Sequence, residues 1–330
     1  MDAATRELYS ATTDRVSGPR RRDCYYGEVP IKVPQKSSGK KSAITILQDN
    51  GLAKIPWLLH GFSTRMGGSS RVYGVNSLNL GFTKDDSRSA VERNRTDFLK
   101  KLGAVTGKKL WPLVTLRQIH SDLIHCVSEM PKDQLAGDGL ITNTPELLLG
   151  IQTADCLPVI LVDTKHKAVG VFHAGWRGTI KRIVEKGAGE MRRWFGTMPN
   201  DIRAVIGPGI HKCCYQVGGE IREQFESQFA YAAELFNETE DYDEVREKYP
   251  MLFLTARAPG HSELPKKIFL DLVEANRHQL IAIGISPKNI SASPLCTSCH
   301  TDMLFSYRAE EGKTGRMMAA VGFKKQNRFI

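Results

Sequence analysis

The chain has no apolar run that approaches the roughly 18 consecutive residues needed for a membrane span. It also has no apolar segment near its start, which argues against a secretory signal peptide. With 330 residues it is long enough to bury a sizeable core, so its stability needs no disulfide framework. These features exclude the fibrous, membrane and disulfide-rich secreted classes, and we expect a cytoplasmic protein.

A long Lys/Arg run interleaved with aromatic residues is also missing, although the formal net charge is +10. Residues 1–41 hold nine basic and five acidic residues, so +4 of that charge lies in this segment. Such a distribution argues against nucleic acid as a partner and favours small anionic ligands.

Residues 1–42 are polar, basic and rich in Ser, Gly and Pro, a composition typical of a disordered leader. The acidic residues Asp2, Glu7 and Asp14 argue against a transit peptide, and the charged leader could recruit a protein partner. We expect residues 43–330 to form one α/β domain. Within it, the seven acids of residues 234–247 predict a solvated insertion rather than a metal site.

Hydrophobic patterning predicts strands and helices in alternation. Apolar, β-branched runs predict strands at 57–62, 113–116, 123–127, 147–152, 158–162, 168–172 and 204–206. Helical spacing predicts helices at 91–102, 180–195, 221–229 and 270–283. The Gly-, Ser- and Asn-rich residues 65–79 predict a loop.

The seven cysteines are an odd number, and without a secretory signal they favour free thiols or metal ligands over disulfides. Residues 296–300 (CTSCH) match the pattern of covalent haem attachment, but a cytosolic α/β protein without an export signal argues against haem. Cys213 and Cys214 are adjacent, and two free thiols are commoner there than a strained vicinal disulfide.

Three short segments place a metal-ligand residue at a predicted strand end: His120 in 117–122, Cys156 in 152–158 and His173 in 171–178. Catalytic zinc commonly takes three protein ligands from this set and leaves a fourth position open. The spacing alone leaves an alternative, in which the cysteine packs as a small hydrophobe and both histidines are hydrogen-bonded.

Several motifs occur together in a recognisable order: residues 60–65 (HGFSTR), 76–81 (NSLNLG), 117–120 (RQIH), 153–156 (TADC) and 173–178 (HAGWRG). Residues 215–218 (YQVG), 270–272 (LDL), 296–297 (CT) and 305–308 (FSYR) extend the match. With these motifs the chain resembles the laccase domain-containing family, once called multicopper polyphenol oxidoreductases. The resemblance implies a single-domain α/β sandwich in which two β-sheets lie between helical layers.

The family resemblance also implies a zinc site formed by His120, Cys156 and His173, with copper disfavoured. It implies phosphorolysis of adenosine, inosine, guanosine and methylthioadenosine, and deamination of adenosine. One thiolate and two neutral imidazoles leave the zinc one positive charge, which suits it to acidify water or position phosphate. Asp155 is a candidate to relay protons or orient a histidine, with a structural hydrogen bond as the alternative.

Two arginines of the family motifs, Arg65 and Arg308, suit phosphate or ribose, with a surface salt bridge as the alternative. Gln118 and Asn79 are substrate-binding candidates because of the motifs that contain them. Glu220 follows a Gly-Gly turn, where we favour an acid at a helix N-terminus over a substrate contact.

Three other functions remain open. Bacterial relatives that edit peptidoglycan precursors by amide cleavage would share the zinc site. A copper polyphenol oxidase is poorly supported, because none of the nine histidines forms a His-x-His pair. A metal-stabilised interaction protein is the non-enzyme alternative, and the complete set of site motifs argues against it.

Overall fold

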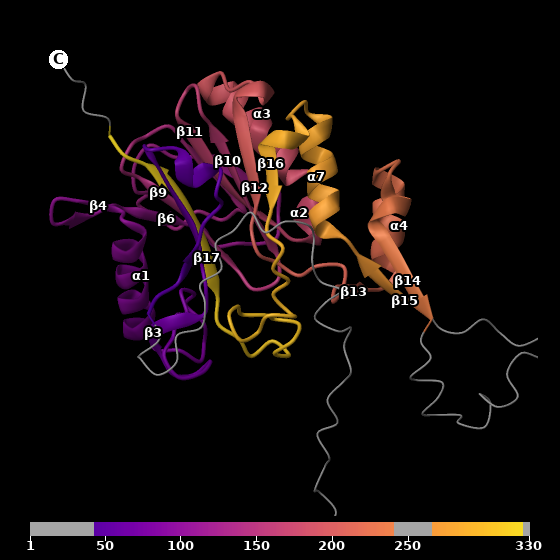
Figure 1. The fold of residues 1–330 in the computed structure, drawn as a ribbon, viewed down its shortest axis with the longest axis horizontal. Helices are drawn as coiled ribbons and strands as arrows, with labels where there is room; N and C mark the ends of the chain where they lie inside the picture. The colour runs from indigo at the N-terminus through magenta and orange to yellow at the C-terminus, as the bar shows by residue number, and fades with distance from the viewer. Residues whose placement is uncertain (1–42, 241–265, 326–330) are drawn as a thin grey trace, which may run out of the picture.

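A computed structural model describes residues 43–240 and 266–325 (Figure 1). The predicted leader, residues 1–42, and the acidic residues 241–247 lie outside the described residues. No helix in the described ranges is both long enough and apolar enough to cross a membrane.

Two β-sheets stacked face to face form the centre of the protein. The five-stranded sheet has the order β1 (Ile46–Leu47), β2 (Leu58–Ser63), β17 (Met317–Phe323), β9 (Leu148–Thr153) and β6 (Leu113–Thr115). The six-stranded sheet has the order β16 (Ile290–Ala292), β12 (Ile202–Ile206), β10 (Leu157–Asp163), β11 (Ala168–Ala174), β8 (Gly139–Thr142) and β7 (Ile124–Cys126).

The alternation of side chains along β10 shows how one strand serves two cores. Ile160 and Val162 belong to the core between the sheets, together with residues of β9 and β17. Val159 and Leu161 point to the opposite face and pack in the core beneath the helices. Because both faces are buried, the strand is apolar along its whole length.

Helices cover both outer faces of the sandwich (Figure 1). The helix α1 (Arg88–Leu102) packs through Phe98 and Leu102 on the five-stranded sheet. The helices α3 (Ile183–Phe195) and α7 (Leu272–Ala282) cover the six-stranded sheet. This confirms the predicted α/β sandwich with two sheets between helical layers.

Smaller elements complete the fold. They are η3 (Leu52–Lys54), β3 (Met66–Ser70), β4 (Val105–Thr106), β5 (Lys109–Leu110), α2 (Trp176–Ile180), η4 (Pro199–Asp201), β13 (Gln216–Val217), α4 (Gly219–Gln228), η5 (Ala232–Leu235), β14 (Phe236–Glu240), β15 (Lys266–Leu270) and η6 (Pro287–Asn289). Strands β13, β15 and β14 form a third sheet beside α4.

Three local predictions are corrected. The predicted loop at 65–79 contains the strand β3. The single helix predicted over 180–195 is broken, because Arg182 has a left-handed backbone with φ 61° between α2 and α3. The helix predicted from residue 270 begins at Leu272, since Leu270 still belongs to β15 and Asp271 caps the helix by accepting from the Glu274 N–H.

Part of the predicted acidic insertion also forms a β-strand. Residues 236–240 form β14, which pairs with β15. Its Glu238 forms ion pairs with Arg222 and Lys266. In this described part, Glu238 is therefore held by cations of the chain.

Candidate metal centre

His120, Cys156 and His173 converge at the ends of three strands. His120 follows β6, Cys156 lies in the turn between β9 and β10, and His173 is near the end of β11. One ligand atom from each residue lies within 4.8 Å of the others. The centroids of the two imidazole rings are 4.9 Å apart, and the ring planes meet at 68°. The structure therefore brings together the three residues that the sequence singled out, in a group able to hold a metal ion.

Asp138 fixes the orientation of His173. Its Oδ1 lies 2.8 Å from Nδ1 of the buried His173 ring. A carboxylate at Nδ1 keeps the proton on that nitrogen, so Nε2 is left as the metal ligand. Orienting a histidine was one of the candidate roles for Asp155, beside proton relay and a structural hydrogen bond; in the structure Asp138 makes the contact with His173.

The same carboxylate also organises the loop that carries His120. Asp138 accepts hydrogen bonds from the backbone N–H groups of Ile119, His120 and Ser121 at 2.6–3.2 Å, and from the Ser121 hydroxyl at 2.8 Å. Burial raises the pKa of Asp138, but the bonds from His173 and Ser121 outweigh it and lower the pKa to about 2. Asp138 is therefore an ionised link between both histidines.

The Cys156 side chain is held in the form that binds metals. Burial raises the pKa of its thiol, but the neighbouring His173 and His120 outweigh burial and lower that pKa to about 6. Burial lowers the pKa of His173, but Cys156 and Asp138 outweigh burial and raise it to about 9, so a metal ion at Nε2 would displace the proton that this nitrogen otherwise carries. These shifts favour a thiolate, which is the form of cysteine that coordinates metal ions.

Gly175 leaves the space that this arrangement needs. A Cβ at residue 175 would lie 2.8 Å from Sγ of Cys156 and 3.6 Å from Cδ2 of His120. The first distance is shorter than van der Waals contact, so any larger residue would displace the thiol. The backbone angle does not require glycine here, because a φ of −73° is open to every residue. Glycine is required because any Cβ would come too close to the thiol.

A cavity of about 620 Å³ opens above the three residues. Its lining includes Gln118, His120, Asp155, Cys156, His173, Tyr215, Tyr307, Arg308 and Arg316. This volume lies in the range of small-molecule sites. A metal-capable group, two arginines and two tyrosines thus share one chamber.

The two arginines reach the cavity from the C-terminal part of the chain. Arg308 donates from its guanidinium to the Gln216 carbonyl at 2.8 Å and lies 5.5 Å from the centre of the Tyr215 ring. Arg316 lies over Tyr307 at 5.6 Å. Arg308 was predicted from its motif, whereas Arg316 was missed.

Asp155 lines the cavity, but its carboxylate is occupied by neighbours. Oδ1 accepts from the hydroxyls of Thr297 at 2.6 Å and Ser306 at 2.7 Å. Oδ2 accepts from the backbone N–H of Arg308 at 2.6 Å. Its backbone is left-handed, with φ 92°, a strained conformation for a residue with a side chain. Burial raises the pKa of Asp155, the bonds only partly opposing it. Asp155 therefore links the Cys156 turn to residues 306–308.

The structure does not bring Arg65 into this chamber. Its guanidinium pairs with Glu310 at 3.0 Å, donates to the Thr301 and Tyr73 carbonyls, and stacks 4.6 Å from the Phe305 ring centre. It borders a separate, smaller pocket. Arg65 therefore forms a salt bridge, mostly buried and not the surface pair given as its alternative, and it is not among the residues that line the main cavity.

Asn79 and Gln118 hold the frame of the cavity. Asn79 is buried, and its Oδ1 accepts from the backbone N–H of Arg316 at 2.9 Å. The Gln118 amide exchanges two hydrogen bonds with the backbone of Gln152, at 2.7 and 2.8 Å. Glu220 lies in the first turn of α4, as expected, and is absent from the described lining of the cavity.

Sequence reasoning missed Asp138, Arg316, Tyr215 and Tyr307 as members of the site. Asp138 stands between two glycines directly before a buried strand, which is the one signal that could have singled it out. Tyr215 and Tyr307 lay within recognised motifs without being chosen.

Comparison with known proteins gives consistent results. The profile of the family described as "Multi-copper polyphenol oxidoreductase laccase" matches residues 59–324. A "Purine nucleoside phosphorylase" of Bacteroides thetaiotaomicron is 31% identical over 271 residues, covering 81% of this chain and 92% of the relative. An "Adenosine deaminase RL5" from an unknown prokaryotic organism is 30% identical over 275 residues, covering 80% and 93%.

Among solved structures, the hypothetical protein YfiH of Bacillus licheniformis superimposes with a TM-score of 0.71. It is 31% identical, and the match covers 89% of this chain and 99% of that one. The similarity therefore extends over the sandwich and the site together.

Proposed function

This chain belongs to the family described as multi-copper polyphenol oxidoreductase laccase, and from that premise we propose that it is a zinc-dependent enzyme of purine nucleosides. It would phosphorolyse adenosine, inosine, guanosine and methylthioadenosine, and deaminate adenosine. One observation carries the proposal: the group His120, Cys156 and His173 lies in a nucleoside-sized cavity that also contains Arg308 and Arg316. The names of relatives at about 30% identity, a purine nucleoside phosphorylase and an adenosine deaminase, support it.

The donor set fits zinc. A thiolate with two imidazoles is a borderline-soft set, and three protein ligands leave the fourth position for water or substrate. Asp138 holds His173 by its other nitrogen, the arrangement found behind most metal-bound histidines. When bound by His120, Cys156 and His173, zinc would supply a Lewis acid able to acidify water for deamination or to position phosphate for phosphorolysis.

Arg308 and Arg316 are the proposed phosphate contacts. Each presents a permanent positive charge at the cavity, and a guanidinium can bind two phosphate oxygens at once. Phosphorolysis moves phosphate to the anomeric carbon while the base leaves, so these cations would hold the attacking anion next to the ribose. Asn79 acts indirectly in this scheme, because it holds the backbone of Arg316.

Tyr215 and Tyr307 are the proposed contacts for the purine ring, since aromatic faces stack on planar bases. Burial raises the pKa of Tyr215 and keeps its phenol neutral. Asp155 is a positioning residue in this scheme, because its oxygens already accept from Thr297, Ser306 and Arg308. Gln118 likewise positions the cavity wall through Gln152.

The test is a panel of the four nucleosides, incubated with and without inorganic phosphate and read by product chromatography, beside zinc and copper content. Inosine should yield hypoxanthine only with phosphate, and adenosine should yield inosine without it. Cys156→Ala and His173→Ala should abolish both reactions, whereas Cys126→Ser, at an exposed thiol of β7, should retain them.

Three results would overturn the proposal. Folded Cys156→Ala protein with wild-type turnover would refute the metal site. Several coppers per chain with oxidation of a diphenol would favour the oxidase. Cleavage of a muropeptide amide without nucleoside turnover would favour the amidase. We further propose that catalysis resides in residues 43–330, so deletion of residues 1–42 should leave turnover unchanged.

A further inference from the structure

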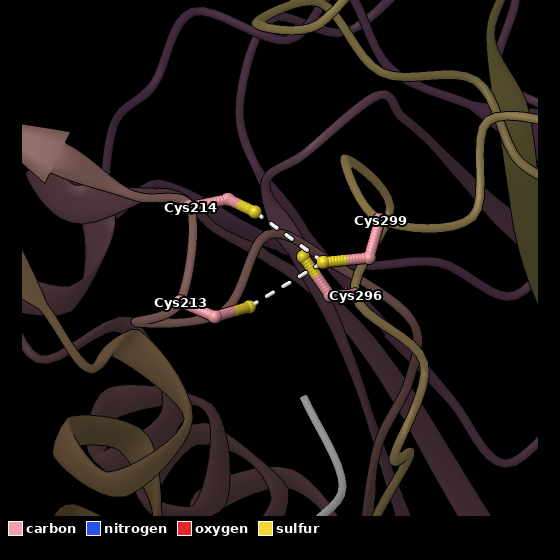
Figure 2. A group of neighbouring side chains, drawn as sticks. All are labelled: Cys213, Cys214, Cys296 and Cys299. Carbon is pink, nitrogen blue, oxygen red and sulfur yellow. Dashed lines mark hydrogen bonds between the residues drawn. The ribbon is translucent and has the colours of Figure 1, made fainter. Parts of the chain in front are cut away.

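Four of the seven cysteines gather in a second group, separate from Cys156. Cys213 and Cys214 come from the segment after β12, and Cys296 and Cys299 come from the segment after β16 (Figure 2). Their four sulfur atoms point toward one another and all lie within 4.8 Å. Sγ of Cys299 is 3.6 Å from that of Cys213 and 3.4 Å from that of Cys214. We call these four residues the cysteine cluster.

Backbone hydrogen bonds bring the two segments together. Gly209 and Cys296 form an isolated parallel bridge, and the Thr297 N–H donates to the Gly209 carbonyl at 2.9 Å. A turn in which the N–H groups of Cys214 and Tyr215 both donate to the His211 carbonyl at 2.9 Å lets adjacent cysteines face the same side. The cluster is therefore built by the fold, from residues about 80 positions apart.

We propose that the cysteine cluster binds one zinc ion as a tetrathiolate, in a second metal site. Tetrahedral zinc with Zn–S bonds of about 2.3 Å places its sulfur atoms about 3.8 Å apart, close to the separations between these thiols. A disulfide is a different geometry, because its sulfur atoms are bonded at about 2.05 Å. A cluster of several irons would need the four sulfurs farther apart, since they would surround a larger core.

The surroundings suit bound thiolates. Cys296 is completely buried, and the other three are partly buried. The backbone N–H of His211 donates to Sγ of Cys296 at 3.5 Å, a type of contact that spreads the negative charge of a metal-bound sulfur. Four protein ligands close the coordination sphere, so this ion would be structural and would offer no position to a substrate.

The cysteine cluster lies next to residues of the cavity wall, so an ion bound there would also affect the cavity. Cys214 directly precedes Tyr215, which lines the cavity, and the next residue, Gln216, accepts a bond from Arg308. Cys296 directly precedes Thr297, whose hydroxyl donates to Asp155. An ion that ties Cys214 to Cys296 would therefore hold two walls of the cavity at a fixed separation.

The test is metal stoichiometry on the full chain, purified under reducing conditions with zinc in the growth medium. We expect two zinc ions per chain. Cys156→Ala should retain one, with X-ray absorption showing four sulfur neighbours. The double variant Cys213→Ser/Cys299→Ser should also retain one, with a mixed sulfur and nitrogen shell and a lower Tm. Cys126→Ser, the matched control outside the cluster, should retain two.

Cobalt substitution provides a readout that needs no turnover. Cobalt-loaded Cys156→Ala protein should keep intense sulfur-to-cobalt charge-transfer bands, and the double cysteine variant should lose most of them. One zinc per wild-type chain that disappears in Cys156→Ala would overturn the proposal. So would iron in place of zinc, or a disulfide within the cluster that persists under the reducing conditions of the purification. The expected total of two rests on the proposed zinc at His120, Cys156 and His173. One zinc per wild-type chain that persists in Cys156→Ala with four sulfur neighbours would support the cysteine cluster and contradict that proposed catalytic zinc.

Discussion

Nδ1 of His173 and Oδ1 of Asp138 lie 2.8 Å apart, and this contact joins a candidate metal ligand to the carboxylate that also holds the His120 loop. We predict that Asp138→Asn weakens zinc binding by about 10- to 100-fold. The amide cannot accept from the imidazole and from all three backbone N–H groups at once, because its NH₂ is a donor. Competition with a chelator of known affinity measures the change.

A matched control exists in the same sheet. Asp163 is buried and makes an equivalent 2.8 Å contact with Nδ1 of His166, away from the cavity. Asp163→Asn should lower stability but leave zinc affinity unchanged. Equal losses of zinc affinity in both variants would show that the effect of Asp138 comes from general destabilisation.

The space beside Cys156 gives a second prediction. Gly175→Ala would place a methyl group 2.8 Å from Sγ of Cys156, so the thiol must shift from its present position beside the histidines. We expect folded protein with at least a tenfold loss of zinc affinity, in the range found when support for a ligand is lost. Gly189→Ala, at an exposed position in α3 with no atom near its Cβ, should retain zinc and gain up to about 1 kcal/mol. Wild-type zinc affinity in Gly175→Ala would contradict the geometry.

The arginines allow a test that separates ligand contact from architecture. Arg308→Met and Arg316→Met should each raise KM for phosphate about tenfold or more, since each removes a charge from the cavity wall. Arg65→Met should leave that KM unchanged and lower the free energy of unfolding by about 2 to 3 kcal/mol, because it removes the salt bridge to Glu310 and the donor to two carbonyls. Phosphate kinetics and urea unfolding on the three variants measure both quantities. A raised phosphate KM in Arg65→Met with normal stability would restore its predicted role.

The strands could be predicted from sequence because strands that are buried on both faces consist of continuous apolar runs, as in β10 and β11. The break between α2 and α3 could not, since apolar spacing continues across Arg182 while its backbone turns left-handed. Likewise, nothing in the pattern of residues 65–79 announces the short strand β3. Local backbone geometry of this kind depends on tertiary contacts.

The sequence motifs predicted the three metal-capable residues, but they did not predict Asp138, the carboxylate that holds both histidines. Asp138 is a single acid, and its role depends on four hydrogen bonds to residues 17 to 19 positions away and one to His173. Both arginines belong to family motifs, so the motifs did not distinguish them. Arg65 pairs with Glu310, whereas Arg308 lines the cavity. The sequence did not predict the cysteine cluster, because its two pairs of cysteines lie about 80 residues apart. Taken separately, they are a vicinal pair and a haem-like pattern.

His60 provides a prediction about pH. Burial lowers its pKa from near 6.5 to about 4, and its Nε2 accepts from the Asp49 N–H at 3.0 Å, as expected for a structural histidine. The folded protein therefore holds this ring neutral, while the unfolded chain protonates it near pH 6.5. Its contribution to stability is complete above pH 6.5 and falls as the pH drops towards 4, by about 3 kcal/mol in total.

Urea unfolding at pH 7, 6, 5 and 4.5 measures this slope against His60→Gln, whose amide oxygen can still accept from Asp49. The variant should start less stable at pH 7, because a flexible amide packs less well than the ring, and should lose less stability on acidification. The difference between the two curves should therefore narrow as the pH falls. Parallel curves would show that His60 is not the group that titrates, and that the acid sensitivity of the fold arises elsewhere.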